Sequence, residues 1–285
     1  MPADTKLVLP PASVLIDEIT TIVSQASAAI LAIDTSTLAK RIKSDGSPVT
    51  AADDASQSVI LAGLSRIFPS IPIVSEEASG AGQISGLGAT FFLVDPLDGT
   101  REFVAGRDEY TVNIALVNQG APVFGCIGSP AFGLIWRGVL GQGAERLELT
   151  AGANANTCRA RTPLRTRKFP ASNLVVAVSH SHFDSRTEQF LPHFPRAERI
   201  ACGSSLKFCR VAEGHVDLYP RLAPTHEWDI AAGHAIVAAA GGMVVKPNGA
   251  ALTYGRFADG FWIPSFVAFG DLIVAARISR IAGLT

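Results

Sequence analysis

A short apolar run that leads directly into two acids is the feature that most constrains this chain. Residues 92–100 read Phe-Leu-Val-Asp-Pro-Leu-Asp-Gly-Thr, which predicts a buried strand that delivers Asp95 and Asp98 at its end. The proline between the acids stiffens the turn, so both carboxylates can face one small volume. The N–H groups of Gly99 and Thr100 could hold phosphate oxygens there. Taken alone, the segment would favour the simpler explanation of an Asp-Gly turn at the end of a strand.

Three other segments place acids at the ends of predicted elements. Glu76 and Glu77 follow a short apolar run, Asp229 lies in the first turn of an alanine-rich helix, and Asp53 begins another helix. Each has a simpler explanation, because a solvated acid pair and helix-capping acids are common. The repetition of the pattern favours a shared site.

Convergence of these acids would require a cation. Two carboxylates about 4 Å apart repel by roughly 4 kcal/mol at an effective dielectric near 20. Oxygen ligands without His or Cys partners favour a hard ion, Mg²⁺ before zinc. Because Mg²⁺ retains water and binds phosphate oxygens, phosphoryl transfer to water is the expected chemistry.

The apolar pattern predicts alternating helices and strands. Apolar residues recur at three- and four-residue spacing over residues 12–33, which is the period of an amphipathic helix. The other predicted helices are 53–67, 204–213 and 227–240, and the predicted strands are 73–74, 91–94, 110–117, 123–127, 174–178 and 216–219. This alternation predicts a mixed α/β or α+β architecture whose sheets are covered by helices.

One segment rich in Gly, Asn, Thr and Arg, residues 141–172, predicts a linker between two halves of the chain. The N-terminal half, 1–150, would carry most of the acids. The C-terminal half, 151–285, would carry Asp229 and the segments that contact the substrate.

Composition argues against a polymeric ligand. Lys and Arg total 24 against 25 Asp and Glu, a net charge of -1, so the broad cationic surface that nucleic acid requires is not expected. Four cysteines without metal or disulfide spacing favour a reducing cytoplasm. We expect no secretory signal and no integral membrane segment. Peripheral attachment to the inner face of the membrane and a homodimer are left open.

Together these segments resemble the lithium-sensitive inositol-monophosphatase superfamily. Its signature is an acid, then Glu-Glu, then D-P-[IL]-D-G-[ST], then W-D separated by eleven residues from G-G. Here Asp229 is followed by eleven residues and Gly241-Gly242, and the order matches from Thr50 onward. The resemblance implies the layered α-β-α-β-α sandwich of that family, an α+β fold.

The resemblance also implies a role for each acid. The implied ligands of two or three Mg²⁺ ions are Glu76, Asp95, Asp98, Asp229 and the backbone carbonyl of Leu97. Asp53 and Thr100 would activate water, and Glu76 would share in catalysis as a ligand. One water would attack phosphorus in line while a second ion stabilises the leaving oxygen.

Four stretches are similar to the CysQ-type 3'(2'),5'-bisphosphate nucleotidases of this superfamily, namely 43–50, 98–103, 203–207 and 217–221. The substrate contacts that this implies are Leu97, Asp98, Gly99, Thr100, His180, Ser204, Lys207, Arg221 and Asp229. Lys207 and Arg221 suit a dianionic second phosphate, although both could be surface cations.

Two positions near the implied substrate are ambiguous. The sequence does not decide between His180 and His182 as a ligand contact, and a structural role for either histidine stays open. Arg101 stands where many relatives carry lysine, a departure that leaves the metal site intact but could alter contacts beside the substrate.

The leading functional prediction is hydrolysis of the 3'-phosphate of 3'-phosphoadenosine 5'-phosphate by metal-activated water, which the resemblance ties to sulfate assimilation. The alternatives are a phosphatase for inositol phosphates, histidinol phosphate or fructose bisphosphate, and a non-catalytic phosphometabolite sensor. The presence of every acid of the pattern together with Thr100 argues against the sensor. Inhibition by Li⁺ follows from the resemblance, and inhibition by Ca²⁺ from its looser coordination geometry.

Overall fold

Six α-helices are formed within the part of the chain that the computed structural model describes, residues 12–35, 41–42, 48–81, 87–170, 173–180 and 184–271. They are α1 (Ala12–Leu31), α2 (Ala51–Ile67), α3 (Thr100–Val104), α4 (Ser185–Phe190), α5 (Leu206–Ala212) and α6 (Glu227–Ala239). Short 3₁₀ helices are η2 (Glu76–Ala81), η3 (Ala155–Thr157), η4 (Leu191–His193) and η5 (Phe257–Asp259). The predicted helices over 12–33, 53–67, 204–213 and 227–240 are confirmed to within two residues at each end.

The larger sheet has seven strands in the order β3-β4-β5-β6-β7-β8-β9. Their bounds are β3 (Ile73–Ser75), β4 (Thr90–Asp98), β5 (Thr111–Asn118), β6 (Ala121–Ser129), β7 (Leu134–Val139), β8 (Gly143–Glu148) and β9 (Ala160–Leu164). Only β3 and β4 run parallel, and the others form antiparallel neighbours. Apolar residues alternate across this sheet, so that Phe91 and Leu93 face one core while Phe92 and Val94 face another.

The second sheet has five strands in the order β11-β10-β12-β16-β14. They are β10 (Val175–Ser179), β11 (Glu198–Cys202), β12 (Leu218–Arg221), β14 (Met243–Val245) and β16 (Phe266–Phe269). Two short ribbons complete the fold, one of β1 (Arg41–Ile42) with β2 (Pro48–Val49), the other of β13 (Thr225–His226) with β15 (Trp262–Ile263).

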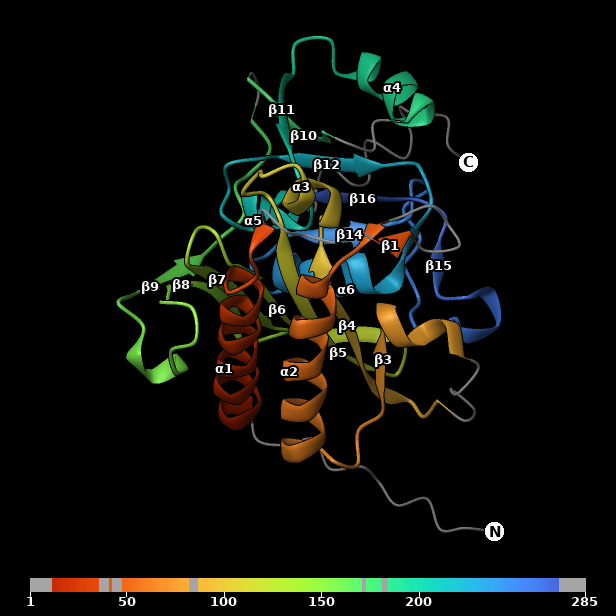
Figure 1. Cartoon of the computed structure of the whole chain (residues 1–285). Coiled ribbons are helices and arrows are strands. Elements are labelled where there is room, and N and C mark those ends of the chain that lie inside the picture. The colour runs from red at the N-terminus through yellow and green to blue at the C-terminus, as the bar shows by residue number, and fades with distance from the viewer. Residues whose placement is uncertain are drawn as a thin grey trace.

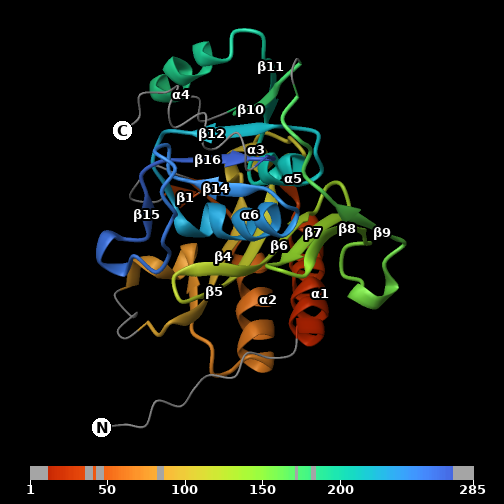
Figure 2. The ribbon, with the colours of Figure 1, turned by 180° about the vertical axis from the view of Figure 1, so that it is seen from behind.

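Helices and sheets alternate as five layers (Figure 1). Helices α1 and α2 cover the outer face of the seven-stranded sheet, α5 and α6 lie between the two sheets, and α4 covers the far side of the five-stranded sheet. The view from behind shows α6 enclosed between the sheets (Figure 2). Three buried apolar clusters fill the interfaces between layers. The predicted α-β-α-β-α sandwich is confirmed.

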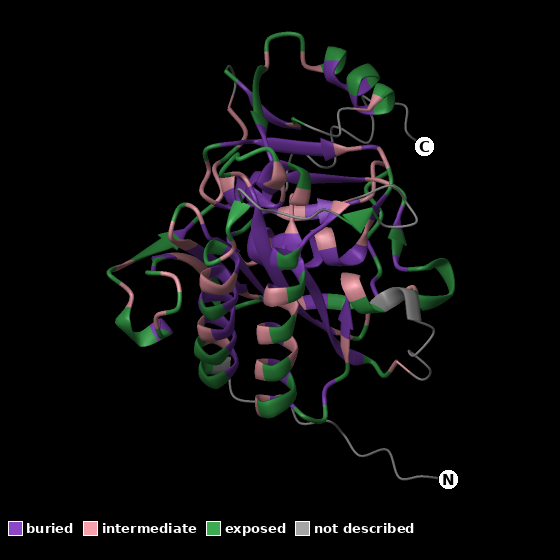
Figure 3. Ribbon diagram, viewed as in Figure 1, coloured by how far each residue is buried: buried purple, intermediate pink, exposed green. Residues whose placement is uncertain are grey.

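Helix α1 is the one helix in the described part of the chain whose length and apolar composition would let it cross a membrane. Here it is a core helix, because Ile19, Val23 and Ile30 are fully buried in the cluster between α1, α2 and the sheet. Figure 3 shows a buried stripe on the face of α1 that meets the sheet and exposed residues on the other side.

Helix α6 packs unusually close to its neighbours. An ideal Cβ on Gly125 of β6 would lie 2.2 Å from the carbonyl oxygen of Ala232. A Cβ on Gly233 would lie 2.3 Å from the ring of Phe208 in α5. Both glycines therefore allow a backbone approach that any side chain would prevent. This close packing sets the position of the first turn of α6, which carries Asp229.

The prediction of a linker over 141–172 is wrong for much of the segment. Strands β8 and β9 lie within it, and β9 continues the seven-stranded sheet beyond residue 150. Strands near a sheet edge have a solvent face that carries polar residues, so their composition resembles that of a linker. The proposed boundary at residue 150 falls in the connection between β8 and β9, which are neighbours in one sheet, so it does not separate two halves.

Candidate active site

The first two acids lie on either side of a bulge in β4. Asp95 pairs with Asn113 of β5, but Asp98 pairs with Thr111, so the register shifts between the two acids. Pro96 lies in this interval and lacks an N–H group for the ladder, which favours a bulge. The strand therefore extends four residues beyond its predicted end at Val94. Both carboxylates line the same cavity.

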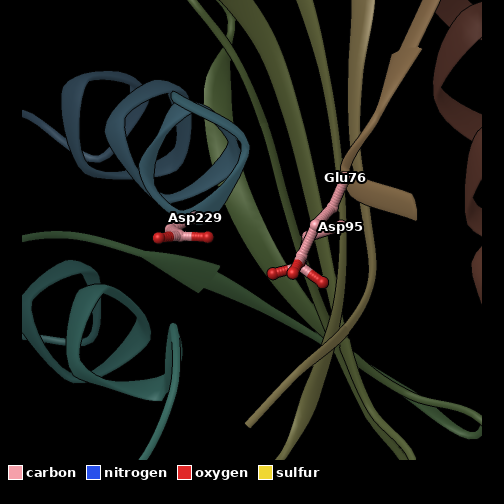
Figure 4. A group of neighbouring side chains, drawn as sticks. All are labelled: Glu76, Asp95 and Asp229. Atoms are coloured by element: carbon pink, nitrogen blue, oxygen red, sulfur yellow. The ribbon is translucent and has the colours of Figure 1, made fainter. Parts of the chain in front are cut away.

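Three acids from distant parts of the chain meet in this cavity. Glu76 begins η2 after β3, Asp95 lies in β4, and Asp229 lies in the first turn of α6. One carboxylate oxygen from each lies within 4.8 Å of the other two. Figure 4 shows Glu76 and Asp95 side by side on the sheet, with Asp229 facing them from α6. The predicted convergence of these three side chains is observed.

The cavity disfavours full ionisation of its acids. Burial raises the pKa of Asp95 well above its ordinary value, and the charges of Glu76, Asp98 and Asp229 raise it further. Burial and the neighbouring Asp229 raise the pKa of Asp98 to about 6, which Lys207 partly counteracts. A positive charge beside these carboxylates would therefore stabilise their ionised forms.

A divalent cation fits this donor set. Carboxylate oxygens form the cluster, and Leu97 lines the same cavity. Among the described residues, the grouped acids include no cysteine or histidine ligand. Hard oxygen donors of this kind suit Mg²⁺, Mn²⁺ or Ca²⁺ rather than zinc.

Asp53 and Thr100 are in hydrogen-bond contact. Oγ1 of Thr100 lies 3.0 Å from Oδ1 of Asp53 and 3.1 Å from the carbonyl oxygen of Leu97. The other oxygen of Asp53 accepts hydrogen bonds of 2.8 Å from the N–H and the hydroxyl of Thr50. Helix capping, the simpler explanation for Asp53, is thus present, but it uses the oxygen that faces away from Thr100.

Asp229 also caps its helix. Its Oδ2 accepts hydrogen bonds from the N–H of His226, at 3.1 Å, and from the hydroxyl of Thr225. These contacts hold the carboxylate in place beside the other acids. Here again the capping role and the proposed ligand role are compatible.

Sequence reasoning missed two polar residues that hold the acids. Oγ of Ser205 lies 2.8 Å from Oδ2 of Asp98 and 2.9 Å from the carbonyl oxygen of Asp229. The side-chain amide of Asn113 donates to the same hydroxyl at 2.9 Å. Ser205 thereby connects the β4 loop with α6. No pattern in the sequence distinguishes it from its neighbour Ser204.

An aromatic stack at the rim was also missed. The ring of His226 lies between Trp228, 4.5 Å away, and Trp262, 3.8 Å away. Trp228 is buried, whereas Trp262 is 45% exposed and lines the cavity. The pairing of β13 with β15 brings Trp262 opposite His226, and this long-range pairing has no local signal in the sequence.

The second half of the chain brings cations to the cavity. Lys207 is only 2% exposed, so a surface role for it is excluded, and its Nζ donates to the carbonyls of Cys202 and Ser204. Nε of Arg221 and Oγ of Ser204 are buried and have no hydrogen-bond partner within the described residues. These two groups are donors that a polar ligand could satisfy.

Of the remaining predicted positions, some line the cavity and others do not. Gly99 and Arg101 line the cavity. Ser179 lines it too, whereas the imidazole of the adjacent His180 lies 3.3 Å from the carboxylate of Glu109. His182 and residues 43–47 lie outside the described residues.

The structure is a phosphatase-type scaffold, with five alternating layers around an acidic cavity at the ends of β3 and β4 and the first turn of α6. The chain belongs to the inositol monophosphatase family, whose model matches residues 8–276. The 3'(2'),5'-bisphosphate nucleotidase CysQ of Salmonella typhimurium is 42% identical over 212 residues, 74% of this chain and 81% of that protein. The resemblance expected from the sequence is confirmed.

Solved structures agree with this assignment. CysQ from Bacteroides thetaiotaomicron, described as a bacterial member of the inositol monophosphatase family, superposes with a TM-score of 0.74 at 31% identity, over 90% of this chain and 97% of that one. An inositol monophosphatase from Thermotoga maritima gives a TM-score of 0.74 at 22% identity, over 94% of this chain and 96% of that one, and supports the fold alone.

Proposed function

We propose that the protein is a Mg²⁺-dependent 3'(2'),5'-bisphosphate nucleotidase that removes the 3'-phosphate of 3'-phosphoadenosine 5'-phosphate. The observation that carries the proposal is that one cavity holds both an acidic cluster and two buried donors, on Ser204 and Arg221, that have no hydrogen-bond partner among the described residues. The bisphosphate nucleotidases at about 40% identity support the choice of substrate.

The acidic half of the cavity would bind the metal and the reacting phosphate. The proposed ligands of Mg²⁺ are Glu76, Asp95, Asp98, Asp229 and the carbonyl of Leu97. When bound, Mg²⁺ would lower the pKa of a coordinated water and offset negative charge on the phosphoryl oxygens. The N–H groups of Gly99 and Thr100 would orient the phosphate. Oγ1 of Thr100 would pass a proton from the attacking water to Oδ1 of Asp53, 3.0 Å away.

The basic half of the cavity would bind the second phosphate. Nε of Arg221 and Oγ of Ser204 would donate to its oxygens, which satisfies two buried polar groups at once. Lys207 adds positive charge but is already bonded to two carbonyls, so it would act through its field. A monophosphate that lacks the second group would leave these donors unsatisfied.

Release of phosphate from a substrate panel tests this function. With Mg²⁺ we expect kcat/KM for 3'-phosphoadenosine 5'-phosphate to exceed that for inositol 1-phosphate and histidinol phosphate by at least about tenfold, because these monophosphates leave the donors of the basic half unsatisfied. Adenosine 5'-phosphate should be resistant, since its phosphate belongs in the basic half. Faster turnover of inositol 1-phosphate than of the nucleotide would refute the proposed specificity.

The same proposal includes a cytoplasmic location for the enzyme. All four cysteines are free thiols, which fits a reducing cytoplasm. A role in sulfate assimilation and inhibition by Li⁺ stay predictions from the family resemblance.

A further inference from the structure

Glu109 connects three parts of the cavity wall that are distant in the sequence. It lies between α3 and β5, and its Oε2 accepts a hydrogen bond of 2.8 Å from the N–H of Gly203. The same oxygen lies 3.3 Å from Nε2 of His180, at the end of β10. Its backbone carbonyl lies 3.1 Å from the place of a Cβ on Gly99, beside the acidic cluster.

The contact with Gly203 is tight as well as polar. An ideal Cβ on Gly203 would lie 2.7 Å from the carbonyl oxygen of Glu109 and 2.8 Å from its Cβ. The glycine therefore packs directly on Glu109, and a larger residue would push the two segments apart. The start of the turn that leads from β11 into α5 is thus held by one acid from the first half of the chain.

This turn carries the residues that face the substrate. Ser204, directly after Gly203, has a φ of 45°, a left-handed conformation that its surroundings must maintain. Ser205 contacts Asp98 and Asp229, and Lys207 bonds back to the turn. A shift at residue 203 would therefore move the basic half of the cavity relative to the acidic half.

We propose that Glu109 is a positioning residue that holds the basic half of the cavity in place for the second phosphate of the nucleotide. Glu109 itself does not line the cavity, so it acts through Gly203 and His180. A hydrogen bond from an N–H to a carboxylate is stronger than one between neutral groups, and holding donors in place before binding strengthens binding. This inference rests on the proposed function, because it assigns a role to that same site.

The test compares Glu109→Ala with the wild type on two substrates, 3'-phosphoadenosine 5'-phosphate and p-nitrophenyl phosphate, which has no second phosphate. We expect KM for the nucleotide to rise about tenfold with kcat changed less than about twofold, because one charge-assisted hydrogen bond is lost. Kinetics with p-nitrophenyl phosphate should not change. Glu109→Gln keeps an acceptor for Gly203 and should restore most of the affinity, and Asp108→Ala, an exposed neighbour with the same charge change, should behave as wild type.

The outcomes separate the two hypotheses. A wild type that fails to hydrolyse the nucleotide overturns the proposed function. Wild-type turnover with an unchanged KM in Glu109→Ala, or an equal loss with both substrates, overturns only the role of Glu109. Gly203→Ala provides a second variant that leaves the carboxylate in place, and it should raise KM for the nucleotide selectively; equal kinetics to wild type would also contradict the proposal.

Discussion

Asp98 lies where the acidic and the basic halves of the cavity meet. Burial and Asp229 raise its pKa to about 6, while Lys207 and the hydroxyl of Ser205 favour its ionised form. One side chain thus experiences both the repulsion that a metal relieves and the attraction of the cations. The buried charge of Asp98 therefore lowers the stability of the metal-free protein.

Asp98→Asn should remove activity and stabilise the metal-free fold. Asparagine keeps the shape and the bond to Ser205 but removes a buried charge, so we expect the free energy of unfolding in EDTA at pH 7.5 to rise by about 1–2 kcal/mol. The rate of phosphate release with Mg²⁺ should fall at least about 100-fold. Urea unfolding and phosphate assays measure both effects, and full activity in the variant would contradict the ligand assignment.

The same carboxyl predicts a pH dependence. Because its pKa is about 6 in the folded protein against an ordinary 3.8, the folded state binds more protons between these values. Its contribution to stability is fully present below pH 3.8 and is lost as the pH rises through about 6. In EDTA, the difference in free energy of unfolding between Asp98→Asn and wild type should grow from pH 4 to pH 7. A difference that stays constant over this range would exclude a raised pKa.

Residue spacing predicted the acids of the site but not the groups that hold them. The acids follow strands or begin helices, which gives each a local signal. Ser205 and Glu109 act through partners about 100 residues away, and serine or glutamate in a turn is common. Only the fold shows which of them are near the site.

At the scale of elements, the placement of α6 depends on the absence of side chains. We expect Gly125→Ala to lower the free energy of unfolding by about 2–3 kcal/mol, because its Cβ would lie 2.2 Å from a backbone oxygen of α6. Gly88→Ala is a matched control, since among the described residues no heavy atom beyond its two chain neighbours lies within 4 Å of that Cβ. Chemical denaturation of both variants checks this, and equal stabilities would show that α6 is not packed as described.

Element boundaries were predicted well where one pattern dominated. Amphipathic periodicity located α1 and α2, a short apolar run located β4, and the alternating segments 110–117 and 123–127 located β5 and β6. The bulge in β4 was missed because the apolar run ends at Val94 and Pro96 was assigned to a turn. Strands β8 and β9 were missed because their exposed faces carry the residues of a loop.

At the scale of the whole molecule, the site exists only because the layers stack. Its acids come from the seven-stranded sheet, from η2 and from the helix between the sheets, and Glu76 and Asp229 are far apart in the sequence. Periodicity predicted the elements, but the order of layers came from the resemblance to a family. No local sequence pattern predicts that the first turn of α6 faces the end of β4.

Binding of a divalent ion is the most direct test of this account. Mn²⁺ can be titrated into EDTA-treated, desalted protein and followed by electron paramagnetic resonance, in which bound Mn²⁺ loses its free-ion signal. We predict saturable binding to wild type, displacement by Mg²⁺, and affinity at least about tenfold weaker in both Asp95→Asn and Asp229→Asn, because each loses a charged ligand. Equal Mn²⁺ affinity in wild type and in both variants would contradict the claim that these acids form one metal site.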